Sequence, residues 1–189
     1  TCAIGSDGKV YCWGTGYLGD GTNNPSSFPV TVDFTGVLAG KTALAIATDG
    51  GSTCILASDN KPYCWGSNNH GQLGDGSYST ALSPVAVDTT GVLSGKTAVT
   101  ITDGDSHVCV TTSDNGVYCW GYNTSGQLGD GTTSTSEFPV QVDTSGAPTG
   151  GDITTGANAY KLQYAQKTVS TCSAQTGYAD VTASSAIAF

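Results

Sequence analysis

The amino-acid sequence predicts an all-β protein assembled from three copies of one unit. The stretch "VYCWGYNTSGQLGDGT" (residues 117–132) closely repeats "PYCWGSNNHGQLGDGS" (62–77), and a shorter copy, "VYCWGTGYLGDGT", occupies residues 10–22. Short runs of β-branched and aromatic residues alternate with turn residues in each copy. No stretch shows the 3.6-residue periodicity of a capped amphipathic helix, apart from brief turns in "GVLAGKTA" and "GVLSGKTA".

The copies follow one another at a nearly constant interval. Three tryptophans lie 52 and 55 residues apart, and prolines and aspartates recur at 55: Trp13, Trp65, Trp120; Pro29, Pro84, Pro139; Asp33, Asp88, Asp143. The first copy lacks three residues between Trp13 and Leu18. A glycine-rich period of this length is typical of units that stack on one another, as in solenoids and propellers.

Four strands are predicted in each unit. In the third copy they are residues 97–102, 107–112, 116–121 and 138–142, separated by turn residues. A β-propeller blade requires four strands. We therefore expect a partial β-propeller of three four-stranded blades, with the repeats at about 1–52, 53–107 and 108–146. In each predicted hairpin both faces are apolar, as in a sheet packed between two neighbours.

Six of the seven cysteines form pairs that lie ten residues apart: Cys2 and Cys12, Cys54 and Cys64, Cys109 and Cys119. The midpoint of each pair is an aspartate, and the next residue is Gly8, Asn60 or Asn115, types that tolerate the left-handed conformation of a three-residue hairpin loop. Such a loop places the two cysteines of a pair directly opposite each other.

Three disulfides within hairpins are therefore predicted, each stabilising by roughly 2.5–3 kcal/mol. They imply an oxidising compartment. The alternatives are reduced, buried cysteines or zinc, and zinc is disfavoured because no C-x-x-C spacing occurs.

The C-terminal part of the chain departs from the repeat. Residues 147–159 have the composition of a linker, and residues 160–189 are expected to form a β-segment because "YKLQYAQ" (160–166) alternates apolar and polar residues. This short segment weakly resembles the start of an Ig-like β-sandwich module. Cys172 has no partner at the repeat spacing, so it is interpreted as a buried thiol, as half of a bridge whose partner lies elsewhere, or as an intermolecular crosslink.

Composition disfavours several classes of function. The chain carries 15 acidic residues, six lysines and no arginine, for a net charge of −9, and the lysines are scattered. Nucleic acid and anionic membrane are therefore poor partners, and no apolar run approaches the ~20 residues of a membrane span. Because the chain has neither a methionine nor a signal peptide, we interpret it as a processed piece of a longer product.

Motifs for catalysis and cofactors do not assemble in this sequence. "GVLAGKT" (36–42) and "GVLSGKT" (91–97) are one residue short of a phosphate-binding loop and continue as strands. Asp103 and Asp105 could offer oxygens to Ca²⁺, but their spacing does not fit an EF-hand and a β-turn is expected. Neither histidine can be placed with a nucleophile and an orienting carboxylate. We expect no catalysis, no cofactor and no metal.

The motif YCWG-x-N-x-x-G-Q-L-G-D-G, at residues 63–76 and 118–131, resembles the regulator-of-chromosome-condensation repeat family. The resemblance covers about residues 1–146 and implies a β-propeller, usually of seven four-stranded blades, that binds proteins through its face loops. The family includes a nuclear exchange factor for a small GTPase, ligase-associated modules and secreted bacterial proteins. The paired cysteines are similar to those of the secreted bacterial type, so exchange activity is not carried over.

These observations predict a secreted or cell-surface binding, adhesive or structural module. Its partner would be a protein or glycan, because polar loops with a few aromatic residues suit such recognition. The predicted contact residues follow each tryptophan: Tyr17, Asn68, Asn69, His70, Tyr122 and Asn123. The alternative is a self-assembling subunit of an extracellular filament or ring, in which a neighbouring chain completes the blade edges.

Overall fold

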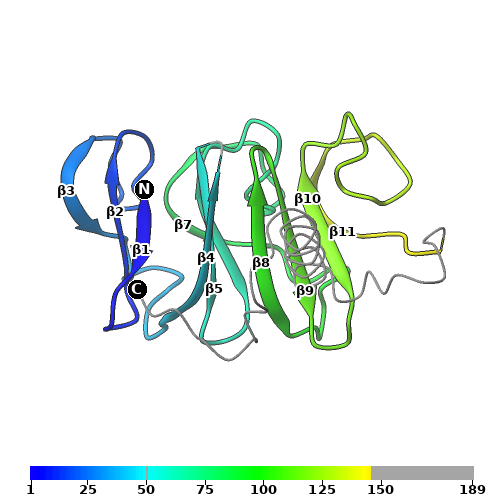
Figure 1. Ribbon diagram of the computed structural model, residues 1–189, viewed down its shortest axis with the longest axis horizontal. Coiled ribbons are helices and arrows are strands. Elements are labelled where there is room, and N and C mark those ends of the chain that lie inside the picture. The colour runs from blue at the N-terminus through cyan, green and yellow to red at the C-terminus, as the bar shows by residue number, and fades with distance from the viewer. Residues whose placement is uncertain (50, 146–189) are drawn as a thin grey trace, which may run out of the picture.

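The computed structural model describes residues 1–49 and 51–145, in which eleven strands form three antiparallel sheets that stand side by side (Figure 1). The predicted linker, the C-terminal β-segment and Cys172 lie outside these residues. The strands are β1 (Cys2–Ile4), β2 (Val10–Gly14), β3 (Ser26–Thr31), β4 (Ala43–Asp49), β5 (Ser52–Ala57), β6 (Pro62–Gly66), β7 (Ala81–Ala86), β8 (Ala98–Gly104), β9 (His107–Thr112), β10 (Val117–Gly121) and β11 (Ser136–Gln141).

Each sheet is a meander in which every strand pairs with the next one in sequence. The second sheet has the order β4-β5-β6-β7 and the third β8-β9-β10-β11, while the first contains β1-β2-β3. The all-β prediction and the propeller-type blades are confirmed, and β8 to β11 follow the four strands expected in the third copy. The first strand of each four-stranded sheet, β4 or β8, comes before the cysteine hairpin of that sheet. The boundaries of a blade therefore differ from those of a repeat counted from Thr1.

The three cysteine hairpins have the predicted register. Each pair of cysteines lies directly opposite in its sheet, with Cα atoms 4.1 Å apart, and the sulfur atoms are bonded at 2.11–2.15 Å. The residues expected in the left-handed conformation adopt it, with φ of 75° at Gly8, 57° at Asn60 and 65° at Asn115. The structure therefore joins all three predicted disulfides.

The hydrophobic core lies between the blades. One cluster fills the junction of the first and second blades, and another fills the junction of the second and third. The middle blade serves both, because alternate residues of a strand point to opposite faces. On β5, Ile55 belongs to the first cluster, and Cys54 and Leu56 belong to the second. This arrangement explains why both faces of each hairpin are apolar.

Backbone hydrogen bonds clamp neighbouring blades at both ends, in the same way at both junctions. At one end, the hairpin tip of a blade accepts from the first strand of the next blade. At the other end, the glycine after the "GD" aspartate donates to the outer strand of the next blade. The four bonds are Ala43 N–H to Gly8 O (2.8 Å), Ala98 N–H to Asn60 O (3.2 Å), Gly21 N–H to Leu82 O (3.0 Å) and Gly76 N–H to Glu137 O (3.1 Å).

Two ends of the stack can therefore be distinguished. The loop face consists of the loops after β2, β6 and β10 together with the β4–β5 and β8–β9 turns. The tip face consists of the cysteine-hairpin tips and the connections that lead into β4 and β8. In Figure 1 the loop face is at the top and the tip face at the bottom. No helix among the described residues is long and apolar enough to cross a membrane.

Candidate functional site

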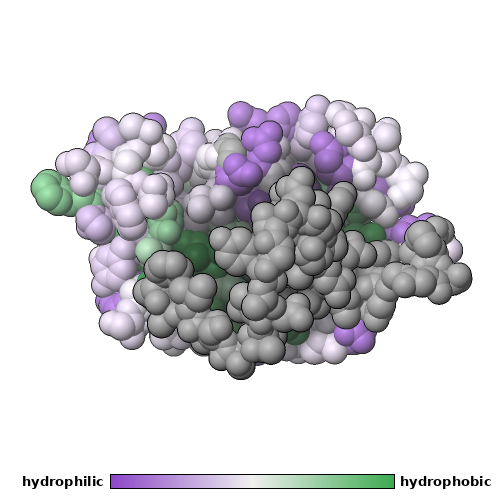
Figure 2. All heavy atoms as spheres, viewed as in Figure 1, coloured by the Kyte–Doolittle hydropathy of each residue, from purple (hydrophilic) through white to green (hydrophobic). Residues whose placement is uncertain are grey.

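All six predicted contact residues lie in loops of the loop face, but two of them are fully buried. Asn68 and Asn123 each have no exposed surface. The prediction that these two side chains contact a partner is therefore wrong. The remaining four, Tyr17, Asn69, His70 and Tyr122, are exposed or half-buried. In Figure 2, polar residues gather along the upper edge of the molecule, where these loops lie.

Asn68 organises the loop between β6 and β7. Its Nδ2 donates to the carbonyl oxygens of Ser77 (3.0 Å) and Ser79 (3.1 Å), and its Oδ1 accepts from the amide of Leu73 (3.0 Å). One buried amide group thus ties the start of the loop to its middle and its end. A side chain whose donors and acceptor are used in this way is part of the scaffold, since an unpaired buried amide would be costly.

Asn123 repeats this network in the next blade. Its Nδ2 donates to the carbonyl oxygens of Thr132 (3.3 Å) and Ser134 (3.0 Å), and its Oδ1 accepts from the amide of Leu128 (2.8 Å). The sequence carried a signal for this role. The first copy, whose loop is three residues shorter, is also the copy that has no asparagine at this place.

The aspartates of the "GDG" triplets close tight turns. Asp20, Asp75 and Asp130 each accept from a backbone amide two residues further on, at 2.9–3.0 Å. The flanking glycines all have positive φ, between 64° and 85°. Together with the buried asparagines, these turns fix the backbone of the loops before any partner arrives, which lowers the entropy lost on binding.

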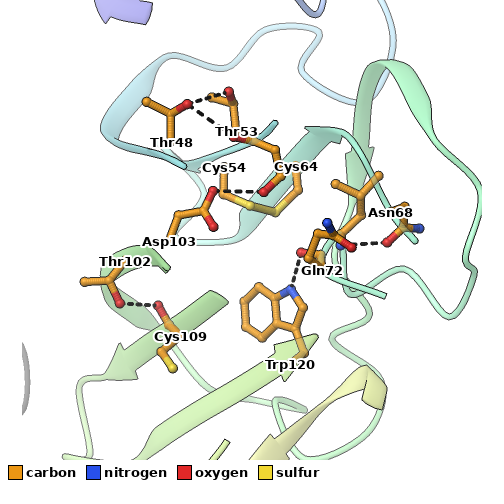
Figure 3. Close-up of a disulfide and its surroundings, with 12 residues drawn as sticks. Thr48, Thr53, Cys54, Cys64, Asn68, Gln72, Thr102, Asp103, Cys109 and Trp120 are labelled. Atoms are coloured by element: carbon orange, nitrogen blue, oxygen red, sulfur yellow. Dashed lines mark hydrogen bonds between the residues drawn. A yellow bond between two sulfur atoms is a disulfide. The ribbon is translucent and has the colours of Figure 1, made fainter. Parts of the chain in front are cut away.

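The tryptophan of one blade packs into the loop of the preceding blade. Trp120 lies against Gly74, where a Cβ atom would be only 2.7 Å from the indole Nε1, and its Nε1 donates to the carbonyl oxygen of Gln72 at 2.9 Å (Figure 3). Trp65 packs in the same way against Gly19, but its buried Nε1 has no hydrogen-bond partner among the described residues. In the shortened first loop Tyr17 takes the place of Gln72.

His70 and Tyr122 meet across the junction of the second and third blades. Their ring centroids are 4.7 Å apart, and the ring planes cross at 61°, an edge-to-face arrangement. His70 comes from the loop after β6 and Tyr122 from the loop after β10, while Asn69 is exposed beside them. The structure thus brings two of the predicted contact residues together. Edge-to-face pairing favours one relative orientation of the rings.

Tyr17 belongs to the other junction. With Leu18, Thr48, Asp49 and Thr53 it lines a cavity of about 210 Å³ between the first and second blades. The cavity lies beside the loop that is three residues short. Tyr17 therefore lies beside a separate recess, and it does not join the pair at the second junction.

Asp103 is a half-buried residue whose Oδ1 atom is fully buried, which sequence reasoning did not identify. It lies on β8 at the loop face, where its Oδ2 accepts from the Ser52 hydroxyl at 3.1 Å, and its buried Oδ1 has no partner within the described part of the chain. Burial raises the pKa of Asp103 to about 7, with a smaller contribution in the same direction from the carboxylate of Asp49. The hydrogen bond from Ser52 acts in the opposite direction.

The other polar residues of this turn have structural roles. Asp105 lies in the β8–β9 turn, where the sequence predicts a turn, and its φ is 60°. The imidazole of His107 lies against Gly104, where a Cβ atom would be 2.7 Å from the ring. No cluster of three or more His, Cys, Asp or Glu side chains that could hold a metal occurs in residues 1–49 and 51–145.

The loop face is also acidic. Four acidic residues lie in its loops and turns, Asp20, Asp75, Asp105 and Asp130, and three more lie at the strand ends that border it, Asp49, Asp103 and Glu137. The four lysines of the described residues, Lys9, Lys41, Lys61 and Lys96, all lie at the tip face. This segregation gives the loop face a negative potential, which attracts positively charged surfaces.

Family models for the regulator of chromosome condensation (RCC1) repeat match this chain. One matches residues 59–111 and again residues 114–155, and a second model of the same repeat matches residues 99–127. The matched segments contain the strands and loops of the second and third blades from the tip of the β5–β6 hairpin onward.

Two similar proteins are human E3 ubiquitin-protein ligase HERC2 and the ultraviolet-B receptor UVR8 of Arabidopsis thaliana. The first is 32% identical over 142 residues, which cover 74% of this chain and 3% of HERC2. The second is 32% identical over 145 residues, which cover 75% of this chain and 32% of UVR8. The chain therefore spans a third or less of the length of these relatives.

Solved structures with the same arrangement include human WBSCR16 and Prp20p from Saccharomyces cerevisiae. The first has a TM-score of 0.63 at 27% identity, covering 74% of this chain and 34% of that one. The second has a TM-score of 0.60 at 26% identity, covering 74% and 35%. Prp20p was characterised together with its binding to Gsp1p and histones.

Proposed function

Because the chain belongs to the regulator of chromosome condensation (RCC1) repeat family, we propose that it is a protein-binding propeller module that contacts its partner through the loop face. The proposal includes no catalytic step. A rigid sheet scaffold with loops gathered at one end is a common way to build a binding surface.

The observation that carries the proposal is the His70–Tyr122 pair. Aromatic side chains that are held in place are the usual anchors of protein interfaces, because they bury a large area and lose little conformational entropy. Both rings are half-buried, and they stand on loops whose backbones are fixed by the buried Asn68 and Asn123. This pair is therefore the proposed centre of the interface, with Asn69 at its rim.

The charge of the loop face supports a partner of opposite sign. Seven acidic residues and none of the described lysines lie at this end. Complementary charge speeds association and suppresses wrong partners more than it adds affinity. We therefore propose that the partner presents a positively charged protein surface, and that the rate of association falls as salt is added.

The proposed location is extracellular or on the cell surface. The support is the three disulfides, since such bonds persist in oxidising compartments. The similarity of the paired cysteines to the secreted bacterial type points in the same direction.

A matched pair of variants tests the proposal. Proteins from the surface and secreted fractions of the source cells are captured on the wild-type chain, on His70→Ala/Tyr122→Ala, and on Lys9→Ala/Val37→Ala, whose sites are exposed at the tip face. Affinity for the captured protein is then measured with each purified chain. We expect the loop-face variant to bind at least about tenfold more weakly, and the tip-face control to bind normally.

Two results would overturn the proposal. One is a partner that binds the loop-face variant normally and the tip-face control poorly. The other is a partner whose binding disappears when its glycans are removed enzymatically, because recognition would then be of a glycan. Circular dichroism of each variant shows that the fold is retained.

A further inference from the structure

A cavity of about 330 Å³ opens at the tip face, at the end of the stack opposite the proposed protein interface. It lies between the hairpin tip of the second blade and the connection that leads from β7 into β8. We call it the tip pocket; its lining residues are Asn60, Lys61, Pro62, Thr89, Leu93, Gly95, Lys96 and Ala98. Its volume is within the range of sites that bind small molecules.

The repeat itself shows why the tip pocket is open. Each position of the lining has a counterpart at the junction of the first and second blades, and there Phe34 occupies the place of Thr89. Phe34 packs against the core cluster that contains Val10, Leu38 and Ala43, the counterparts of Pro62, Leu93 and Ala98. The first junction is thus filled by the phenyl ring of Phe34, and the second junction has the smaller Thr89 in the same place.

The floor of the tip pocket is apolar. Leu93 and Ala98 are each only 4% exposed, and Pro62 is buried. A ring or a short aliphatic group bound here would bury its apolar surface against these residues. The equivalent place at the first junction already holds the phenyl group of Phe34.

The rim of the tip pocket is cationic. Lys96 donates to Asp114 at the tip of the third blade, and this partner raises the pKa of the lysine, so that the ammonium is retained. Lys61 is exposed and has no carboxylate within ion-pairing distance among the described residues. The pocket therefore combines an apolar floor with one lysine that forms no ion pair among the described residues, although the whole chain has a net charge of −9.

From this combination we infer that the tip pocket is a binding site for a small amphipathic carboxylate. The apolar group of the ligand lies on Pro62, Leu93 and Ala98, in the place that Phe34 fills at the first junction. Its carboxylate faces the ammonium of Lys61. The site is independent of the loop face and of the protein partner proposed for it.

The ligand class is tested with benzoate on the full chain. Amide shifts in a ¹⁵N-labelled sample are followed during titration with benzoate, with benzyl alcohol, which has the ring without the charge, and with acetate, which has the charge without the ring. We expect saturable shifts centred on Leu93, Gly95 and Ala98 with benzoate, and markedly weaker ones with the other two.

The site is tested with substitutions that the repeat supplies. Thr89→Phe places at the second junction the residue that the first junction already holds, and it is expected to weaken benzoate binding at least about tenfold. Thr144→Phe, at the corresponding exposed position of the third copy, is the matched control and leaves binding unchanged. Lys61→Gln is expected to weaken benzoate about threefold without affecting benzyl alcohol.

Phe34→Thr provides an independent measurement that does not depend on how Thr89→Phe folds. It opens the first junction and is expected to add a second set of benzoate-dependent shifts, around Leu38 and Ala43. The inference is overturned if benzoate gives no saturable shifts, if benzyl alcohol binds equally well, or if a folded Thr89→Phe chain binds benzoate like the wild type.

Discussion

The indole Nε1 of Trp120 donates a hydrogen bond across the junction of two blades to the carbonyl oxygen of Gln72, 48 residues earlier in the chain, at 2.9 Å. The ring that makes this bond rests on Gly74, which has no side chain to displace it. The repeated "GQLG" therefore specifies the contact between blades as well as the turn within one blade. Its glycine is the first position at which this contact can be tested.

Gly74→Ala is expected to destabilise the protein by about 2–4 kcal/mol, because the new methyl group would collide with the Trp120 ring at a residue whose φ is +65°. The control is Gly131→Ala, whose φ is +81° with no atom near the added Cβ. This substitution adds backbone strain without a collision, and we expect it to lower the free energy of unfolding by only about 1 kcal/mol. Urea unfolding of both variants measures the difference, and equal losses would show that the tryptophan contact contributes nothing.

Asn68→Ala is expected to lower the free energy of unfolding by about 2–4 kcal/mol, because it leaves the carbonyl groups of Ser77 and Ser79 and the amide of Leu73 without their partner. The adjacent Asn69 is exposed, so Asn69→Ala should change stability by less than about 0.5 kcal/mol. Thermal and urea unfolding distinguish the two. A near-neutral Asn68→Ala variant would contradict the role assigned to the buried amide.

The disulfides predict a defined thiol count. Alkylation of the unfolded, non-reduced chain should label none of Cys2, Cys12, Cys54, Cys64, Cys109 and Cys119, as peptide mass spectrometry can show. Replacing Cys54 and Cys64 together with alanine should lower stability by about 2–4 kcal/mol, since the bridge no longer restricts the unfolded chain. Labelling at all six positions would refute the bridges.

The half-buried carboxylate of Asp103 predicts a pH dependence of stability. Its pKa is raised to about 7 in the folded protein, against 3.8 for an unperturbed aspartate. The folded state therefore binds the proton more tightly, and this group's contribution to stability is fully present below about pH 3.8 and is lost as the pH rises through about 7.

Asp103→Asn isolates this effect from the other carboxylates, which remain in both chains. The variant should gain stability relative to the wild type as the pH rises from 5 to 9, by an amount on the order of 1–3 kcal/mol. Urea unfolding at several pH values measures the difference. A difference that does not change with pH would show that Asp103 keeps an ordinary pKa.

The predictions from sequence succeeded where the determining interactions are local. Hairpin register follows from the loop chemistry at Gly8, Asn60 and Asn115, and it places the cysteines opposite each other without any knowledge of distant contacts. The stacking of the blades was expected because both faces of each hairpin are apolar.

The candidate site was less accessible to sequence reasoning, because burial in a loop depends on how the loop closes. Asn68 and Asn123 are polar residues in glycine-rich segments, which are usually exposed, yet each loop folds around its asparagine. The pairing of His70 with Tyr122 depends on the packing of adjacent blades, since 52 residues separate them in sequence. The burial of Asp103 depends on the same junction, where Ser52 of the preceding blade lies beside it.

The buried Nε1 of Trp65, which has no hydrogen-bond partner in residues 1–49 and 51–145, makes the two junctions of the stack unequal. The junction of the first and second blades therefore lacks the indole hydrogen bond that the other junction has. We expect heat or mechanical tension to separate β1, β2 and β3 from the rest of the stack first. The two remaining sheets would then hold together and melt as one body.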